Sequence, residues 1–432
     1  MNLVYISVDS LRYDLVTAVH TPNFMKLAAT AGCLFDEMIV QTPFTVPSHA
    51  SMLTGLYPFN HGLRQFSGQK LHEKAQTLFQ YLARRGYDIA VYRDTAVFGA
   101  AHGYSPAYFQ NTSSPTLTQL RRFLAQPHKQ PFCLFIHYWG IHTPYDTLTP
   151  IQSWRDAAYI LLIHLRTRLG WTPFPLTPQH PYWIRRLQQV RTLLLSGGVE
   201  TVIQGYQRAL RHFDTWLGGL YSLLQRQCLA NDTLLVITSD HGECFNEHRE
   251  AALYPDGYEH GLFLFENVVR VPALFVGQGV PAGRCISGQV ESVDLLPTVY
   301  ELLGFSGEAD PGFLTMDGHS LIPRWQETMP HKPFTYSETR HRGVNLVMGR
   351  SQQHKLIQDR VNDRAWLFDL QQDPGEHTNI LKQQPEIGQQ LTDALMQFEA
   401  THSQSAPPTV PASAAETAAV RQRLQQLGYV EE

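Results

Sequence analysis

The spacing of hydrophobic residues predicts strands that alternate with helices over the first three hundred positions. Short, continuous apolar runs rich in Val, Ile and Leu are typical of strands that are buried on both faces. Such runs occupy residues 3–8, 88–92, 132–137 and 233–238. Helical spacing is clearest over residues 23–31, 77–85 and 201–227. The alternation predicts an α/β fold with a mostly parallel sheet and helices on both of its faces.

The pattern changes after residue 305. Short strand-like runs follow at residues 334–337, 345–349, 354–358 and 365–370. Together with a helical pattern near 385–400, they predict a small antiparallel C-terminal sheet with one packed helix. Frequent Ser, Pro and Ala at 401–415 indicate a linker. We therefore divide the chain into a main domain at 1–305, a subdomain at 306–400, and a linker with a short terminal helix at 401–432.

Residues 146–198 fit the alternation least well. The segment is rich in Trp, Pro and Arg and mixes apolar with basic positions. We expect a helical insert in the main domain. The alternative is a cap over the substrate or a surface that touches a membrane.

Composition narrows the class of protein. The net charge is −4, from 34 basic and 38 acidic residues. This charge does not imply a basic face that would bind nucleic acid. Five scattered cysteines without a CxxC pair argue against a disulfide framework or a cysteine zinc site. An acid at position 9 argues against a signal peptide, and no long apolar window predicts a transmembrane segment. We expect a cytoplasmic protein, whose oligomeric state the sequence does not define.

Acidic residues follow two of the predicted strands. Asp9 follows the first strand, and Asp240 with His241 follows the strand at 233–238. Residues at the carboxyl ends of parallel strands meet at the edge where α/β proteins bind ligands. Single residues of this kind often only cap a turn, but two acids and a histidine together favour a site for a divalent metal ion.

A helix is expected to begin near Thr45. Pro47 suits the first turn of a helix over 48–53, and Gly55 would end it. A helix start attracts anions through free N–H groups and the positive end of the helix dipole. Thr45 is then either a simple N-cap or a hydroxyl held beside a bound sulfate or phosphate group.

Several motifs, in order along the chain, resemble those of the sulfatase family. They are Val8-Asp9-Ser10-Leu11-Arg12, Thr45-Val46-Pro47-Ser48-His49 with Leu53-Thr54-Gly55, His142-Thr143-Pro144, Ser239-Asp240-His241-Gly242-Glu243, Arg270-Val271-Pro272, Asp294-Leu295-Leu296-Pro297-Thr298, and Leu367-Phe368-Asp369 with Asp373-Pro374-Gly375. The resemblance covers residues 2–380. It implies the three-layer α/β/α fold of the alkaline phosphatase superfamily.

The resemblance also implies roles for single residues. Asp9, Asp240 and His241 would bind one divalent metal ion, and Thr45 would be both a ligand and the nucleophile. His260 and then His142 would protonate the leaving group. His49, where the family has Arg, and Arg270 would contact the substrate, and the alternative for Arg270 is a structural partner that orients the acids. Each of these histidines has a purely structural role as its alternative.

Two departures from the family pattern change the expected chemistry. Sulfatases convert a Cys or Ser to formylglycine, but Thr45 carries an extra methyl group, so we expect no formylglycine. A route through a covalent phosphothreonine remains open without formylglycine. We therefore expect the small-molecule substrate to be a phosphate ester in preference to a sulfate ester. Ser10 replaces an acid, and the remaining donors suit Mg²⁺, Mn²⁺ or Zn²⁺, whereas the family favours Ca²⁺.

The sequence therefore predicts a metal-dependent hydrolase of sulfate or phosphate esters that acts through Thr45. One alternative is a transferase that moves a phospho-group to an alcohol acceptor. The other is an inactive binding module with the same fold, which the replacements at Ser10 and Thr45 favour and the retained Asp9, Asp240 and His241 disfavour.

Overall fold

The strands of the main domain form one mixed sheet. In this computed structural model, the described residues are 1–93, 99, 102–104, 109–110, 114–128, 130–142, 199–245, 247–248, 258–306, 308–403 and 409–427. Within them, nine strands form the sheet, in the order β11-β2-β10-β7-β1-β6-β4-β5 with β12 beside β2. Their bounds are β1 (Asn2–Val8), β2 (Gly32–Ile39), β4 (Asp88–Tyr92), β5 (Phe109–Gln110), β6 (Phe132–Tyr138), β7 (Thr233–Ser239), β10 (Arg270–Val276), β11 (Arg284–Ile286) and β12 (Val290–Glu291).

Only β10 runs against the common direction of this sheet. It pairs antiparallel with both β2 and β7. The other pairs, β1 with β6 and β7, β4 with β5 and β6, and β2 with β11 and β12, are parallel. The mostly parallel sheet expected from the sequence is therefore confirmed, and the four expected strands are β1, β4, β6 and β7.

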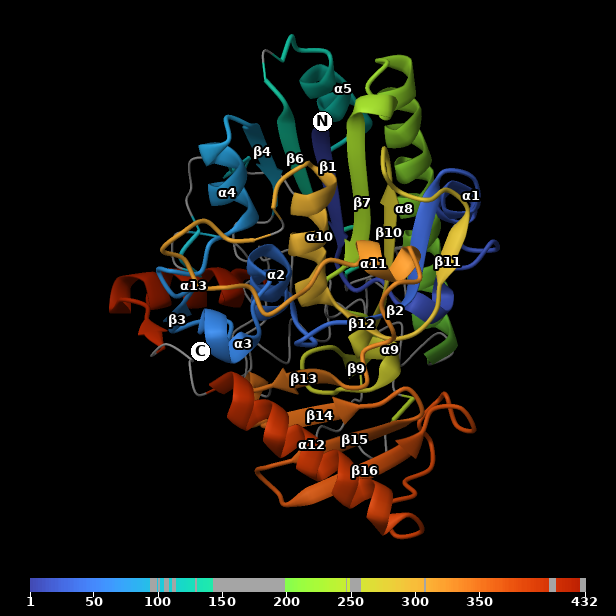
Figure 1. Ribbon diagram of the computed structural model, residues 1–432, viewed down its shortest axis with the longest axis vertical. Helices are drawn as coiled ribbons and strands as arrows, with labels where there is room; N and C mark the ends of the chain where they lie inside the picture. The colour runs from blue at the N-terminus through green and yellow to red at the C-terminus, as the bar shows by residue number, and fades with distance from the viewer. Residues whose placement is uncertain are drawn as a thin grey trace, which may run out of the picture.

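Helices cover both faces of the sheet (Figure 1). One face carries α2 (Thr45–Thr54), α4 (Leu78–Arg84) and α10 (Leu295–Leu302), and the other carries α1 (Pro22–Thr30), α5 (Leu117–Leu124) and α8 (Val199–Arg226). Residues of β1 alternate between the two cores, with Tyr5 packed in the first and Val4 and Ile6 in the second. This alternation follows from the two-residue repeat of a strand. The three-layer arrangement predicted from the sequence is confirmed.

Short elements fill the connections. They are the helices α3 (Pro58–His61), α9 (Glu266–Val269) and α11 (Ile322–Trp325), the 3-10 turns η1 (Tyr13–Leu15), η4 (Ala230–Asp232), η5 (Ser292–Asp294) and η6 (His341–Gly343), and the paired strands β8 (Cys244–Phe245) and β9 (Tyr258–Glu259).

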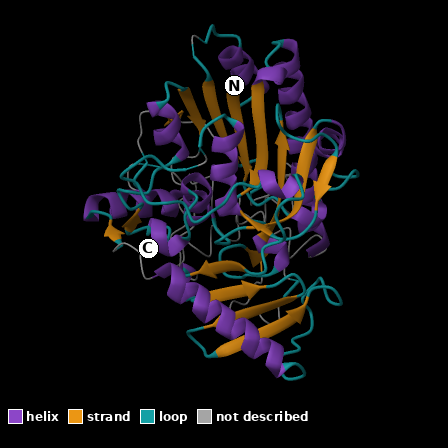
Figure 2. Cartoon of the chain, viewed as in Figure 1, coloured by secondary structure: helices purple, strands orange, loops and turns teal. Residues whose placement is uncertain are grey.

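A second, smaller sheet lies beyond the carboxyl ends of the parallel strands (Figure 2). Its four antiparallel strands are β13 (Thr335–Thr339), β14 (Leu346–Arg350), β15 (His354–Asp359) and β16 (Arg364–Asp369). Helix α12 (Pro385–Ser403) packs across it. The expected antiparallel sheet with one packed helix is confirmed.

The chain then returns to the main domain. Strand β17 (Val410–Pro411) pairs with β3 (Gln69–Lys70), and Lys70 Nζ lies 2.6 Å from Glu416 Oε1 of α13 (Ala414–Leu427). Part of the segment expected as a linker is thus tied to the main domain by backbone hydrogen bonds.

The structure bears on two of the expectations from composition. All five cysteines are free thiols in the structure. Among the described residues, no helix combines the length and apolar character that crossing a bilayer requires. The expected insert at 146–198 lies outside the described residues.

Candidate active site

Three adjacent parallel strands deliver polar side chains to one point. The ends of β7 and β6 flank the end of β1, because Val8 is in register with Ser239 on one side and Tyr138 on the other. Asp9 follows β1 directly, and its N–H donates to the carbonyl of Tyr138 at 2.9 Å. Asp240 follows β7 in the same way. The expected meeting of strand-end acids therefore occurs.

The two carboxylates face an unprotonated nitrogen of His241. Its Nδ1–H donates to the Gly242 carbonyl at 2.8 Å, which leaves a lone pair on Nε2. That nitrogen lies 3.4 Å from Asp240 Oδ2 and 3.8 Å from Asp9 Oδ1. Burial, with the nearby charge of His260, holds the pKa of His241 well below its ordinary value, so the ring is neutral. Metal-bound histidines are commonly oriented by such a carbonyl hydrogen bond.

The electrostatics of the two acids fit a cation. Both are fully buried, and one donor atom from each of Asp9, Asp240 and His241 lies within 4.8 Å of the others. Burial and the charge of Asp9 raise the pKa of Asp240 well above its usual range. Burial also opposes ionisation of Asp9, but His142, His137 and His241 outweigh it and lower that pKa. Asp240 Oδ2 accepts no hydrogen bond from the described residues, and a bound cation would satisfy it.

Thr45 begins helix α2 beside this group. Its Oγ1 lies 3.3 Å from His241 Nε2. Phe44, and not Thr45, is the N-cap, so the helix starts earlier than the sequence indicated. Gly55 ends it with φ of 68°, as expected. Ser48 Oγ donates to the Asp240 carbonyl at 2.6 Å, which ties the first turn of α2 to the end of β7.

His49 links the first turn of α2 to strand β1. Its Nδ1–H donates to the Thr45 carbonyl at 2.8 Å, and its Nε2 accepts from Ser7 Oγ at 2.8 Å. Burial and the neighbouring His137 lower its pKa well below the ordinary value, which matches a neutral ring in this role. Its contact with substrate stays a prediction.

His260 and His142 lie next to His241. The ring of His260 stacks on that of His241 with centroids 4.1 Å apart, and His142 packs edge-on against His260 at 5.2 Å. Glu243, which is fully buried, places Oε1 3.3 Å from His260 Nδ1. The structure therefore brings both expected acid candidates to the cluster and adds a carboxylate that orients one of them.

Arg270 lies at the start of β10, and its described contacts are with residues outside the histidine and aspartate cluster. Its Nε donates to the Asp36 carbonyl at 2.8 Å, and its guanidinium lies 4.2 Å from the ring centre of Tyr13. Neither partner belongs to the metal-ligand candidates. Arg270 thus braces the neighbouring strand β2, and its contact with substrate stays a prediction.

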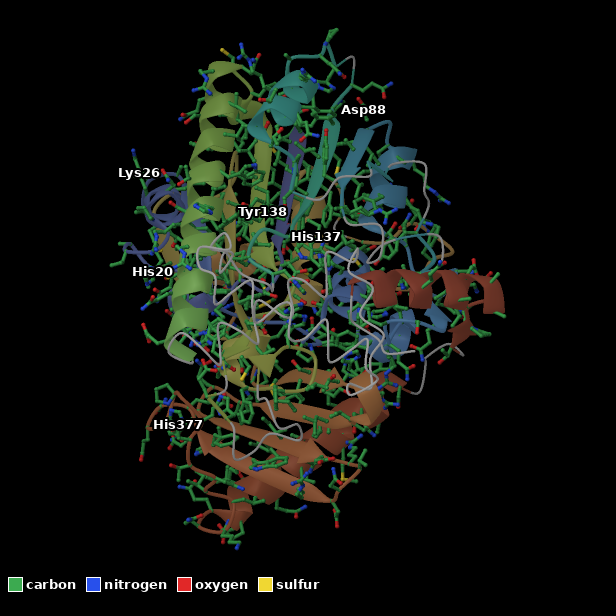
Figure 3. The ribbon with its side chains drawn as sticks, turned by 180° about the vertical axis from the view of Figure 1, so that it is seen from behind. His20, Lys26, Asp88, His137, Tyr138 and His377 are labelled. Atoms are coloured by element: carbon green, nitrogen blue, oxygen red, sulfur yellow. The ribbon has the colours of Figure 1, made fainter. Side chains whose placement is uncertain are left out.

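Two residues of the cluster were not singled out from the sequence. His137 ends the apolar run of β6, and its Nε2 lies 3.2 Å from Asp9 Oδ2. Figure 3 labels it in the interior of the molecule. The signal was one histidine at the carboxyl end of a buried strand. Glu243 gave a weaker signal, because a single acid after a strand usually serves a turn.

Known proteins match both the sequence and the fold. The family model described as Sulfatase matches residues 1–305. Arylsulfatase K from Danio rerio is 32% identical over 427 residues, which cover 86% of this chain and 77% of that protein. Two solved structures match the fold at lower identity. A Bacteroides thetaiotaomicron protein assigned to the sulfatases has a TM-score of 0.68 at 19% identity and covers 96% of both chains. Phosphonate monoester hydrolase of Agrobacterium radiobacter has a TM-score of 0.66 at 18% identity, covering 96% of this chain and 97% of that one.

Proposed function

Because this chain belongs to the sulfatase family, we propose that it is a metal-dependent ester hydrolase whose nucleophile is Thr45. One observation carries the proposal. Thr45 Oγ1 lies at the start of α2 and 3.3 Å from His241 Nε2, in the cluster that holds Asp9 and Asp240. A hydroxyl at a helix start, beside the donors for a cation, is placed to attack a phosphorus or sulfur centre.

Asp9, Asp240 and His241 would hold the metal ion, with Thr45 as a further donor. Their two carboxylates, one neutral imidazole and one hydroxyl form a donor set that first-row divalent metals accept. When bound, the metal supplies positive charge that lowers the pKa of the Thr45 hydroxyl and stabilises charge on the ester's non-bridging oxygens.

The reaction has two steps. Ionised Thr45 Oγ1 bonds to the phosphorus or sulfur atom, while the bond to the leaving oxygen breaks and its electron pair takes a proton from His260. Water then gives one proton to His260, its oxygen bonds to the same atom, and the bond to Thr45 Oγ1 breaks. The oxyanion product leaves, and the starting charge state returns.

Glu243 gives His260 its orientation for this role. Its carboxylate lies 3.3 Å from Nδ1, so that nitrogen is the donor and Nε2 carries the transferable proton. The T-shaped contact with His142 supports the same ring at its edge. A carboxylate partner also stabilises the protonated imidazole that the first step requires.

We propose a phosphate ester as the preferred substrate, with a sulfate ester as the alternative. The methyl group on Cβ of Thr45 prevents formation of formylglycine, so the nucleophile acts as an alcohol and forms a covalent threonyl ester. The phosphonate monoester hydrolase among the similar folds agrees with attack at phosphorus. Because a relative is named an arylsulfatase, a sulfate ester is the alternative substrate. The cytoplasmic location stays a prediction from the sequence.

Assays on aryl esters test this proposal. We would compare p-nitrophenyl phosphate, bis-p-nitrophenyl phosphate and p-nitrophenyl sulfate with wild-type protein and with Thr45→Ala. Thr54→Ala is the matched control, since Thr54 ends the same helix and its hydroxyl donates to the Ala50 carbonyl. We expect phosphate turnover in wild type and control and its loss in Thr45→Ala. Turnover that survives Thr45→Ala excludes the threonine nucleophile, and faster sulfate than phosphate turnover overturns the substrate preference.

A further inference from the structure

The end of β1 provides one carboxylate fewer than the family pattern implies. Ser10 stands at the position of the second acid, and its Oγ donates to Asp9 Oδ1 at 2.8 Å. Its backbone N–H lies 3.3 Å from Asp240 Oδ1. Ser10 therefore orients the two acids through hydrogen bonds to one oxygen of each. The other oxygens, Asp9 Oδ2 and Asp240 Oδ2, lie 3.2 Å and 3.9 Å from a side chain on a neighbouring strand.

That strand is β6, and it presents His137 to both oxygens. His137 is in register with Ser7 of β1, so its ring lies beside the end of the first strand. Its Nε2 is 3.2 Å from Asp9 Oδ2 and 3.9 Å from Asp240 Oδ2. Ligand atoms that sit about 2.1 Å from one ion are separated from their neighbours by roughly 3.0–3.4 Å. The distance from His137 Nε2 to Asp9 Oδ2 falls in that range. The distance to Asp240 Oδ2 exceeds the range by an amount that a small side-chain movement would remove.

From this geometry, we propose that His137 is an additional ligand of the metal centre. The inference rests on the proposed function, because it assigns a ligand to that same centre. Asp9 would then lie between two imidazoles, with Oδ1 facing His241 at 3.8 Å and Oδ2 facing His137 at 3.2 Å. The imidazole from β6 would add a donor to a set that has one carboxylate fewer because of Ser10, and it would do so from the Oδ2 side of both acids.

Besides His241, two buried histidines lie near Asp240, and one donor atom from each of His49, His137 and Asp240 lies within 4.8 Å of the others. Of these two histidines, His137 is the better placed ligand. His49 Nδ1 also lies 3.7 Å from Asp240 Oδ2, but it donates to the Thr45 carbonyl at 2.8 Å. A nitrogen that carries a proton cannot bind a metal ion. The ring of His49 instead packs edge-on against His137 at 4.8 Å and fixes its plane.

This ligand set predicts which metal the centre selects. Two carboxylates and two imidazoles favour Mn²⁺ or Zn²⁺, whereas Ca²⁺ prefers oxygen ligands throughout. We therefore expect the full-length protein to bind Mn²⁺ or Zn²⁺ in the presence of excess Ca²⁺.

Metal binding by His137→Gln tests the assignment without using activity. Glutamine keeps a hydrogen-bond donor near Asp9 but removes the imidazole, so a purely structural role would survive. His102→Gln is the matched control, because His102 is equally buried and its Nε2 donates to the Phe66 carbonyl at 2.9 Å. Calorimetry would give the affinity of each metal-stripped protein for Mn²⁺. Pulsed EPR of the Mn²⁺-loaded protein would count the directly bound imidazole nitrogens.

We expect two bound imidazoles in wild type and control, one in His137→Gln, and affinity for Mn²⁺ lower by about 10–100-fold or more. Unchanged affinity in His137→Gln, or one imidazole in wild type, overturns the role of His137 and leaves the proposed function intact. No binding of Mn²⁺ or Zn²⁺ by wild type overturns the metal centre itself. If His137→Gln fails to fold, the nitrogen count of wild type alone decides the inference.

Discussion

Glu243 Oε1 and His260 Nδ1 lie 3.3 Å apart in a buried carboxylate–imidazole pair. The pair connects the segment after β7 with the segment after β9, and neither of its members is a metal-ligand candidate. The stack of His260 on His241 at 4.1 Å fixes the ring in the third dimension. The proposed metal ligands and the proposed proton donor therefore meet at His241, whose Nε2 faces Asp9 and Asp240 and whose ring stacks on His260.

Glu243→Gln should slow esters of poor leaving groups more than esters of good ones. A glutamine cannot stabilise the protonated His260, so donation to the leaving oxygen weakens. We expect kcat for an alkyl ester to fall roughly 10–100-fold, while p-nitrophenyl phosphate changes little, because its leaving group needs no proton. The exposed Glu301→Gln serves as the control. An equal loss across all leaving groups would mean that Glu243 only supports the fold.

Removing the metal should lower the stability of the wild-type protein more than it lowers the stability of the Asp240→Asn variant. Without a cation, burial and then the charge of Asp9 disfavour the ionised form of Asp240 and raise its pKa well above the usual range. Asparagine removes that repulsion, so we expect the metal-free variant to melt at least as high as metal-free wild type. Adding Mn²⁺ at 100 times Kd should stabilise wild type by about 2.7 kcal/mol and leave the variant unchanged. Equal stabilisation of both proteins in thermal melts contradicts this prediction.

The sequence predicted the local parts of the site. Asp9, Asp240 and His241 directly follow apolar runs, and Thr45 precedes a helical one, so each could be located from its own neighbours. The structure brings all four together. Their roles remain proposals, but their proximity follows from the rule that parallel strands end at one edge.

The parts that depend on strand order could not be predicted in the same way. His137 lies in a continuous apolar run, and only the pairing of β6 with β1 shows that it faces Asp9. Strand β2 escaped detection because Asp36 and Glu37 interrupt its apolar pattern where they are partly exposed. The pairing of β17 with β3 joins segments more than three hundred residues apart, and no local pattern encodes it.

Gly242→Ala should disrupt the segment that carries His241 and Glu243. A Cβ at this position would lie 2.0 Å from the backbone oxygen of Asn267, which cannot move aside like a flexible side chain. The Gly242 N–H also donates to the Val268 carbonyl at 2.7 Å. We expect loss of Mn²⁺ binding and a lower melting temperature in the variant. Wild-type Mn²⁺ affinity in calorimetry would show that the segment can shift without moving its ligand.

A buried charge cluster joins the small sheet to the main domain and should make stability depend on pH. Lys355 Nζ lies 3.1 Å from Glu266 Oε1 and 2.8 Å from Glu376 Oε1. Burial opposes ionisation of both acids, but Arg350 and Lys355 lower the pKa of Glu266. For Glu376, burial outweighs the attraction of Lys355 and, with the charge of Glu266, raises the pKa from 4.5 to about 7.

Glu376→Gln should therefore remove a loss of stability that wild type shows between pH 5 and pH 8. Because the folded pKa of Glu376 lies above the unfolded value, its contribution is fully present below about pH 4.5 and is lost as pH rises through about 7. The whole rise corresponds to about 3 kcal/mol. Urea unfolding at pH 5.5 and pH 8 would measure the difference between wild type and variant at each pH. Relative to Glu376→Gln, we expect the free energy of unfolding of wild type to be about 2 kcal/mol lower at pH 8 than at pH 5.5. The control is Glu73→Gln at an exposed position, which should stay within about 0.5 kcal/mol of wild type at both pH values. A constant difference between wild type and Glu376→Gln would mean that Glu376 is ionised throughout this range, with Lys355 outweighing burial.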